Sequence, residues 1–137
     1  MVVEEIMTKN PVTISPETSV GEAIERLVEM NIRHLPVVKD GELVGILSER
    51  DVRAIAFDVV QDLGDPGNAR LQFQAPVRDI MHTDVLSVEQ GTDVGDLIDE
   101  MLESRVGALP VVDQHTRKLV GIVSYIDVIR AARPLFG

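Results

Sequence analysis

The sequence contains no cysteine and no tryptophan, and only 3% of its 137 residues are aromatic. Without cysteine, the chain cannot form disulfides or a thiolate metal site. With so few aromatic rings, a hydrophobic core must consist of aliphatic side chains, and hydrophobic residues make up 45% of the chain. A chain of this length forms one compact domain or two very small ones.

Basic residues are also scarce, because 13 Lys and Arg stand against 23 Asp and Glu, which gives a net charge of −10. This charge argues against nucleic acid and anionic membranes as partners, since non-specific binding to phosphates depends on Lys and Arg. No apolar run approaches the roughly 20 residues of a membrane-spanning helix, and Glu4 and Glu5 interrupt any signal peptide at the start. We therefore expect a soluble, cytoplasmic protein.

What the sequence does contain is an internal repeat. Leu-Pro-Val-Val occurs at residues 35–38 and 109–112, and Leu-Val-Gly-Ile occurs at 43–46 and 119–122. The two copies align without a gap up to the turn that follows the first motif, and a folded duplication tolerates an insertion in a turn. We predict two repeats, at residues 1–58 and 77–137, joined by a linker at 59–76 whose Gly, Pro and Asn residues mark a loop.

Each repeat has the same predicted order of elements. Short extended segments at 12–14 and 86–88 precede an amphipathic helix, which starts after Ser19 in the first repeat and from Asp93 in the second. Two apolar strands follow, and in the first repeat Asp40-Gly41 between them predicts a type I′ hairpin turn. A second helix starts at Ser48 and at Ser124. The predicted fold class is α+β, with tandem β-α-β-β-α units.

The sequence offers little support for catalysis. His34, His82 and His115 belong to no recognisable motif, and no HExxH, phosphate-binding lysine loop or GxGxxG is present. The many carboxylates are explained by solvated helix faces. We predict that the chain is not an enzyme, holds no metal and requires no cofactor.

One element in both repeats has polar groups suited to ligand binding. It is a strand that passes through a glycine into a Ser-x-x-Asp at the start of a helix. It comprises Gly45, Ser48 and Asp51, and again Gly121, Ser124 and Asp127. A helix N-terminus suits a phosphate, an aspartate can accept from the two hydroxyls of a ribose, and glycine lets a ligand approach the backbone. The alternative is a plain helix cap, and the two roles are compatible because a cap hydroxyl keeps further hydrogen-bonding capacity.

The order of these motifs, found twice, resembles the CBS (cystathionine-β-synthase-type) domain, and the tandem resembles a CBS pair, or Bateman module. The resemblance implies two units related by a pseudo-two-fold axis, with sheets packed at a central cleft and helices outside. It also implies a bound adenosine derivative, such as AMP, ADP, ATP or S-adenosylmethionine, and a homodimer.

The resemblance assigns roles to particular residues. Asp51 and Asp127 would hold ribose hydroxyls, and Ser48 and Ser124 would contact the ribose or the first phosphate. The residues near the base and along the apolar walls around the adenine would be Thr13, Ser87, Leu35, Pro36, Leu109, Pro110, Ile46 and Ile122.

The repeats differ in their basic residues. The first has Arg33-His34 and Arg50, where the second has Gly107-Ala108 and Ile126. We therefore predict unequal sites, one of which binds a phosphorylated nucleotide more than tenfold better. Either site could be the stronger one, because the resemblance implies sites that draw on both repeats, so that Arg33 and His34 could face the ligand held by Asp127. Arg33 and Arg50 could instead be ordinary surface charges, and His34 could be a residue at the edge of the core.

The sequence thus predicts a regulatory module that binds AMP, ADP or ATP. A regulated partner protein, or the module's own dimer, would respond to the binding. Two alternatives remain open. One is an interaction or dimerisation module without a ligand. The other is a sensor of S-adenosylmethionine, NADH or a dinucleotide.

Overall fold

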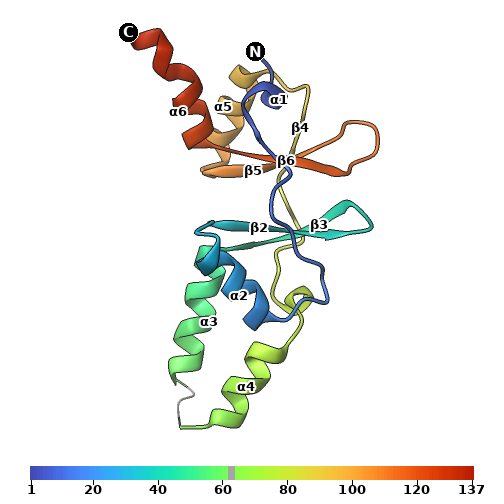
Figure 1. The fold of residues 1–137 in the computed structure, drawn as a ribbon, viewed down its shortest axis with the longest axis vertical. Coiled ribbons are helices and arrows are strands. Elements are labelled where there is room, and N and C mark those ends of the chain that lie inside the picture. The colour runs from blue at the N-terminus through green and yellow to red at the C-terminus, as the bar shows by residue number, and fades with distance from the viewer. Residues whose placement is uncertain (62–63) are drawn as a thin grey trace. The chain divides into compact units, whose positions relative to one another are not determined.

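The computed structural model describes residues 1–61 and 64–137 and shows a mixed α+β protein (Figure 1). In chain order the elements are α1 (Val3–Ile6), β1 (Thr8–Lys9), α2 (Val20–Glu29), β2 (His34–Lys39), β3 (Glu42–Ser48), α3 (Glu49–Gln61), α4 (Pro66–Gln74), the 3-10 helix η1 (Val77–Asp79), β4 (Val88–Glu89), α5 (Val94–Ser104), β5 (Ala108–Val112), β6 (Leu119–Ser124), α6 (Tyr125–Ala132) and the 3-10 helix η2 (Arg133–Phe136). Among the described residues, no helix is both long and apolar enough to cross a membrane.

The contacts divide the chain into two compact units whose bounds differ from those of the repeats. The first-repeat unit comprises Val12–Asp40 and Val44–Val85, and the second-repeat unit comprises Met1–Pro11, Gly41–Leu43 and Leu86–Gly137. Each unit therefore contains the first segment of the other repeat. We call these segments arm 1 (residues 6–9, in the second-repeat unit) and arm 2 (residues 80–83, in the first-repeat unit).

The second-repeat unit contains a sheet with the strand order β1-β6-β5-β4. Strand β6 lies antiparallel to both β1 and β5, and β4 lies parallel to β5. Strand β1 belongs to arm 1, and its Thr8 lies opposite Ile122 of β6. The arm that begins the chain thus completes the sheet of the second repeat.

The first-repeat unit has the same arrangement in a shorter form. Strands β2 and β3 form a two-stranded sheet. Single bridges extend it on either side, a parallel one between Ile14 and Val37 and an antiparallel one between Ile46 and His82 of arm 2. The extended segments predicted at 12–14 and 86–88 are thus shorter than expected, since they amount to the bridge at Ile14 and to the start of β4.

A helix cap and a hairpin turn form where the sequence predicts them. Helix α2 begins after Ser19, whose hydroxyl accepts a hydrogen bond from the backbone N–H of Glu22 at 3.1 Å. The hairpin turn has positive φ at Asp40 (53°) and Gly41 (84°), as a type I′ turn requires. Both predictions are confirmed.

The predicted loop between the repeats is wrong over most of its length, because helix α3 continues to Gln61 and helix α4 spans Pro66–Gln74. Asp65 caps α4 by accepting from the N–H of Asn68 at 3.3 Å, and Pro66 occupies the first turn. Asp followed by Pro therefore marked a helix start, where Pro is favoured because its missing N–H has no partner to lose. Residues 62 and 63 of the predicted linker lie outside the described part of the chain.

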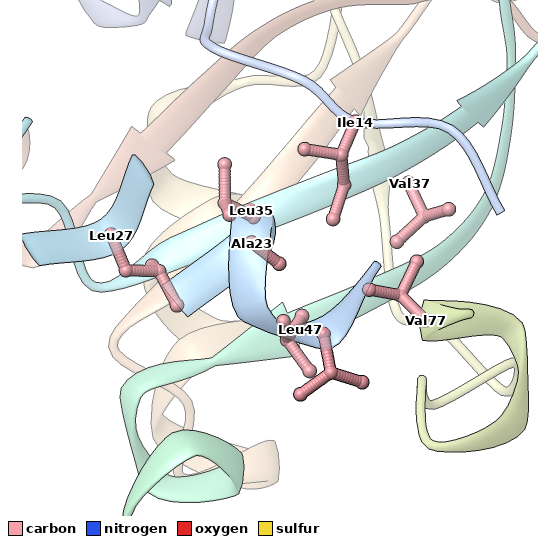
Figure 2. Close-up of a cluster of buried hydrophobic side chains, with 8 residues drawn as sticks. Ile14, Ala23, Leu27, Leu35, Val37, Leu47 and Val77 are labelled. Atoms are coloured by element: carbon pink, nitrogen blue, oxygen red, sulfur yellow. The ribbon is translucent and has the colours of Figure 1, made fainter. Parts of the chain in front are cut away.

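Each unit has its own aliphatic core, as the composition predicts. In the first-repeat unit, side chains from β2, β3 and α2 point toward one another (Figure 2). Helices α2 and α3 lie on one side of the β2–β3 sheet (Figure 1). The buried members of this core are Ile14, Val20, Ala23, Leu27, Leu35, Val37, Leu47 and Val77. The core of the second-repeat unit contains Val3, Val88, Leu97, Met101, Leu109, Val111 and Val123.

The two arms explain why strands β3 and β6 each contain a glycine, Gly45 and Gly121. A Cβ atom added at Gly121 would lie 2.6 Å from Sδ of Met7 and 2.8 Å from the carbonyl oxygen of Thr8. A Cβ atom at Gly45 would lie 2.5 Å from Sδ of Met81 and 3.0 Å from the carbonyl oxygen of His82. The sequence predicts that these glycines let a ligand approach the backbone. The structure corrects this interpretation, because the space beside each glycine is filled by an arm.

Replacing Gly121 with alanine should therefore destabilise the protein by about 1–3 kcal/mol, because the Met7 side chain can move but the backbone of the arm cannot do so freely. Urea unfolding followed by circular dichroism measures this free energy. The matched control is Gly91→Ala, where the new Cβ atom would lie 3.6 Å from Oε1 of Gln114, an ordinary contact. The control should change stability by less than about 0.5 kcal/mol. Equal losses in the two variants would contradict the packing argument.

Candidate functional site

The candidate site of the first repeat lies where β3 passes into α3. Ser48 ends the strand, and its backbone N–H and its hydroxyl both donate to Oδ2 of Asp51, at 2.8 and 3.0 Å. In return, the backbone N–H of Asp51 donates to the Ser48 hydroxyl oxygen at 3.3 Å. This reciprocal pair satisfies N–H groups that the start of a helix leaves without partners.

The second repeat builds the same junction between β6 and α6. Ser124 donates to Oδ2 of Asp127 through its backbone N–H at 2.9 Å and its hydroxyl at 3.2 Å, and the Asp127 N–H donates back at 3.4 Å. Asp127 is buried, with 8% of the residue exposed, and Arg130 lies 3.6 Å from its Oδ1. The helix-cap role that we kept open is thus present in both repeats, and in both it uses the same carboxylate oxygen, Oδ2.

The other carboxylate oxygen has different surroundings in the two repeats. Oδ1 of Asp51 lies 2.7 Å from Nε2 of His82, which arm 2 brings alongside β3. Thr8 occupies the corresponding place in arm 1, opposite Ile122. We missed His82 at the sequence level because it belongs to no motif. The alignment of the two repeats, which pairs His82 with Thr8, held the signal.

The position of His34 fits the alternative of a residue at the edge of the core, and its contact with a ligand stays a prediction. His34 is the first residue of β2 and is half-buried. Burial lowers the pKa of its imidazole, and the neighbouring guanidinium of Arg33 lowers that pKa further, although the carboxylates of Asp51 and Glu49 act in the opposite direction. His34 is therefore mostly neutral at pH 7, so its ring can form hydrogen bonds but carries little positive charge.

The predicted arginines lie at the surface of the same unit. Arg50 is exposed in the first turn of α3, and Arg33 is exposed just before β2, where its carbonyl oxygen accepts from the N–H of Glu49 at 2.8 Å. The side chain of Glu49 is paired with Arg53 at 3.0 Å. The basic residues of the first repeat are thus accessible, and a local carboxylate that could compete for them is already engaged.

The residues assigned to the base and to the apolar walls fall into two groups. Leu35 and Leu109 belong to the cores of their units, and Pro36 and Pro110 are also buried. Half-buried positions with a partly accessible surface are Ile46, Ile122, Thr13 and Ser87. The carbonyl oxygen of Thr13 accepts from Arg26 at 3.3 Å. Contact of any of these residues with an adenine remains a prediction.

The described residues contain no group of three or more His, Asp or Glu side chains arranged to hold a metal ion. Both junctions present a carboxylate, a hydroxyl and backbone groups, which act by hydrogen bonding. Such an arrangement can hold the hydroxyls of a sugar.

The pKa of His34 predicts a pH dependence of stability. Because this pKa is lower in the folded chain than in the unfolded chain, the unfolded chain takes up a proton first as the pH falls below about 6.5. The stability that neutral His34 contributes is present above that pH and is lost as the pH falls through the folded value. Between about pH 7.5 and 5.5, His34→Gln should therefore lose less stability than the wild type in urea unfolding. Equal losses in the two proteins would contradict this account.

Comparison with known proteins shows a similarity along almost the whole chain. Inosine-5′-monophosphate dehydrogenase of Methanocaldococcus jannaschii is 32% identical over 128 residues, which cover 93% of this chain but 23% of that enzyme. The chain thus spans less than a quarter of that relative, and the match carries no enzymatic activity with it.

Two solved structures cover the chain almost completely. The crystal structure of CBSX2, a CBS-pair protein of Arabidopsis thaliana, in complex with AMP has a TM-score of 0.82 and 34% identity, over 99% of this chain and 98% of that one. The CBS domain pair of protein MJ0100 with 5′-methylthioadenosine and S-adenosyl-L-methionine has a TM-score of 0.75 and 28% identity, over 98% of each chain.

The family model of the CBS domain matches residues 3–58 and again residues 77–134. These matches contain both Ser-x-x-Asp junctions and both hairpins. The chain therefore belongs to the CBS domain family, as a tandem pair of CBS domains.

Proposed function

We propose that this CBS pair is a regulatory module that binds an adenine nucleotide, AMP, ADP or ATP, and transmits its binding to a partner protein or to its own dimer. The observation that carries the proposal is the pair of strand-to-helix junctions, each of which presents an aspartate held by a serine. The complex of CBSX2 with AMP, which is similar over almost the full chain, supports the choice of ligand.

The chemistry of the junctions fits a nucleoside. A carboxylate offers about four acceptor positions, and the serine in each junction uses two of them on Oδ2. Oδ1 remains the oxygen with which Asp51 or Asp127 can accept from ribose hydroxyls. The ribose would be held by the same side chain that caps the helix, so binding and folding would share one carboxylate.

The phosphates would be held in the first repeat. Arg50 and Arg33 are exposed there, and the backbone N–H groups at the start of α3 add a partial positive charge. The second repeat offers Ile126 and Gly107 at the matching positions. We propose that the two sites differ in affinity for a phosphorylated ligand for this reason.

The regulatory output follows from linkage. A ligand can shift the protein between two arrangements only by its difference in affinity for them. We propose that residues 1–58 and 77–137 act as the two functional halves, joined by 59–76, and that a cytoplasmic homodimer or a regulated protein senses the change. Regulation, rather than catalysis, is the activity that we assign to this chain.

A second ligand class has support of its own. The structure of the MJ0100 pair contains 5′-methylthioadenosine and S-adenosyl-L-methionine, which carry a ribose but no phosphate. Asp51 and Asp127 fit such ligands as well as they fit a nucleotide, and the ligand's charge would distinguish the two cases. A CBS pair that uses its junctions only as caps is the remaining alternative.

Thermal unfolding tests the proposal directly. AMP, ADP or ATP at about 100 times its dissociation constant should raise Tm by roughly 5–10 °C, because it stabilises the folded state by about 2.7 kcal/mol. Asp51→Asn combined with Asp127→Asn should abolish this rise and leave a cooperative unfolding transition. Asp99→Asn, an exposed position on α5, is the control that should keep the rise. A response to S-adenosylmethionine alone favours the second ligand class, and no response to any of these ligands would overturn the proposal.

The charge argument makes a separate prediction about Arg50. Arg50→Ile, which copies the residue at position 126, should weaken AMP binding about three- to tenfold, through the loss of a charge-assisted hydrogen bond at an exposed position. Adenosine, which has no phosphate, should bind both proteins equally in titration calorimetry. Arg70→Ile, on α4, is the matched control. If adenosine and AMP lose affinity equally, Arg50 does not contact the phosphate.

A further inference from the structure

We propose that His82 is a positioning residue that restrains ribose binding at Asp51, so that the first repeat holds a ribose less tightly than the second repeat does. The inference rests on the proposed function and deepens it, since it names what regulates one of the two sites. It starts from the difference between two residues, His82 and Thr8, that occupy the same place in arm 2 and arm 1.

The acceptor positions of the two carboxylates give the reason. On Asp51, Ser48 uses both positions of Oδ2, and His82 takes a position on Oδ1 through a hydrogen bond of 2.7 Å. A single position is left for a ligand, out of about four that a carboxylate offers. A ribose brings two hydroxyls, so Asp51 can accept from both of them only after His82 has withdrawn.

Asp127 has no hydrogen-bonded competitor of this kind in the described part of the chain. Ser124 uses its Oδ2 in the same way, but Oδ1 accepts no hydrogen bond there and faces Arg130 at 3.6 Å. Thr8, which stands where His82 stands in the other unit, makes no hydrogen bond to Asp127 among the described residues. Asp127 therefore keeps two acceptor positions, one for each hydroxyl of a ribose.

The backbone holds His82 in this place. The N–H of Ile46 donates to the carbonyl oxygen of His82 at 3.0 Å, and the N–H of His82 donates to that of Ile46 at 3.1 Å. Met81, the residue before it, fills the space beside Gly45. The imidazole thus projects from a docked arm toward Asp51. Its side chain is 62% exposed, so it can rotate away into solvent. We therefore expect a restraint of about three- to tenfold in affinity and not a complete block.

The restraint also predicts a difference in sugar selectivity. A site that can accept from both hydroxyls loses an interaction when one hydroxyl is missing. A site with a single free position loses little. The Asp127 site should therefore prefer AMP to 2′-deoxy-AMP clearly, and the Asp51 site should distinguish them weakly.

A reciprocal exchange of the two arm residues tests the inference by titration calorimetry with AMP and 2′-deoxy-AMP. Each site is observed alone, the Asp51 site in an Asp127→Asn background and the Asp127 site in an Asp51→Asn background. His82→Thr should tighten AMP binding at Asp51 about three- to tenfold and raise its preference for AMP over the deoxy ligand. Thr8→His should weaken AMP binding at Asp127 and lower that preference. Thermal unfolding without ligand shows that each variant is folded.

The outcomes separate this inference from the proposed function. Weaker AMP binding in His82→Thr would show that His82 contacts the ligand, and unchanged affinity and selectivity would show that it does not compete. Either result overturns the restraint and leaves the nucleotide module intact, provided that Asp51→Asn lowers binding in the wild-type background. A wild-type chain that binds no adenosine ligand overturns both proposals.

Discussion

The docking of each arm against a glycine in strand β3 or β6 is the contact on which the rest of the structure depends. Met7 and Met81 fill the space beside Gly121 and Gly45, where a Cβ atom would collide with sulfur and with backbone. Because each arm belongs in sequence to one repeat and in space to the other unit, neither unit is complete without a segment from the other half. The duplication therefore produces two units that depend on each other through the exchange of their arms.

The Ser-x-x-Asp junctions have a structural role and use the same carboxylates to which we assign the binding role. The serine and the aspartate satisfy the N–H groups at the helix start, and the arrangement is nearly identical in α3 and α6. The cap commits one carboxylate oxygen and fixes the direction of the other. A rigidly held carboxylate loses little conformational entropy when it accepts from a ligand, so the cap would prepare the proposed site for binding.

The two repeats share this junction and differ in what surrounds it. The first has accessible arginines, a half-buried histidine whose burial lowers its pKa, and His82 on the aspartate. The second has a more deeply buried aspartate beside Arg130. Under our proposals, the charges of the first repeat would favour a phosphate while His82 would oppose the ribose, and the balance of the two effects would set the order of affinities.

The sequence by itself determined the features that depend on neighbouring residues: the duplication, the Asp40-Gly41 turn, the helix starts at Ser19, Ser48 and Ser124, and the reciprocal Ser–Asp pairs three residues apart. The sequence-based prediction was wrong at α4, because Pro and Gly indicated a loop where Asp65 caps a helix. Tertiary structure alone decided the exchange of the arms, the occupation of the space beside the glycines, the burial of His34 and the bond between Asp51 and His82, which are 31 residues apart. These features depend on chain segments that meet only in the folded protein, and local hydrogen-bonding preferences carry no information about which segments will meet.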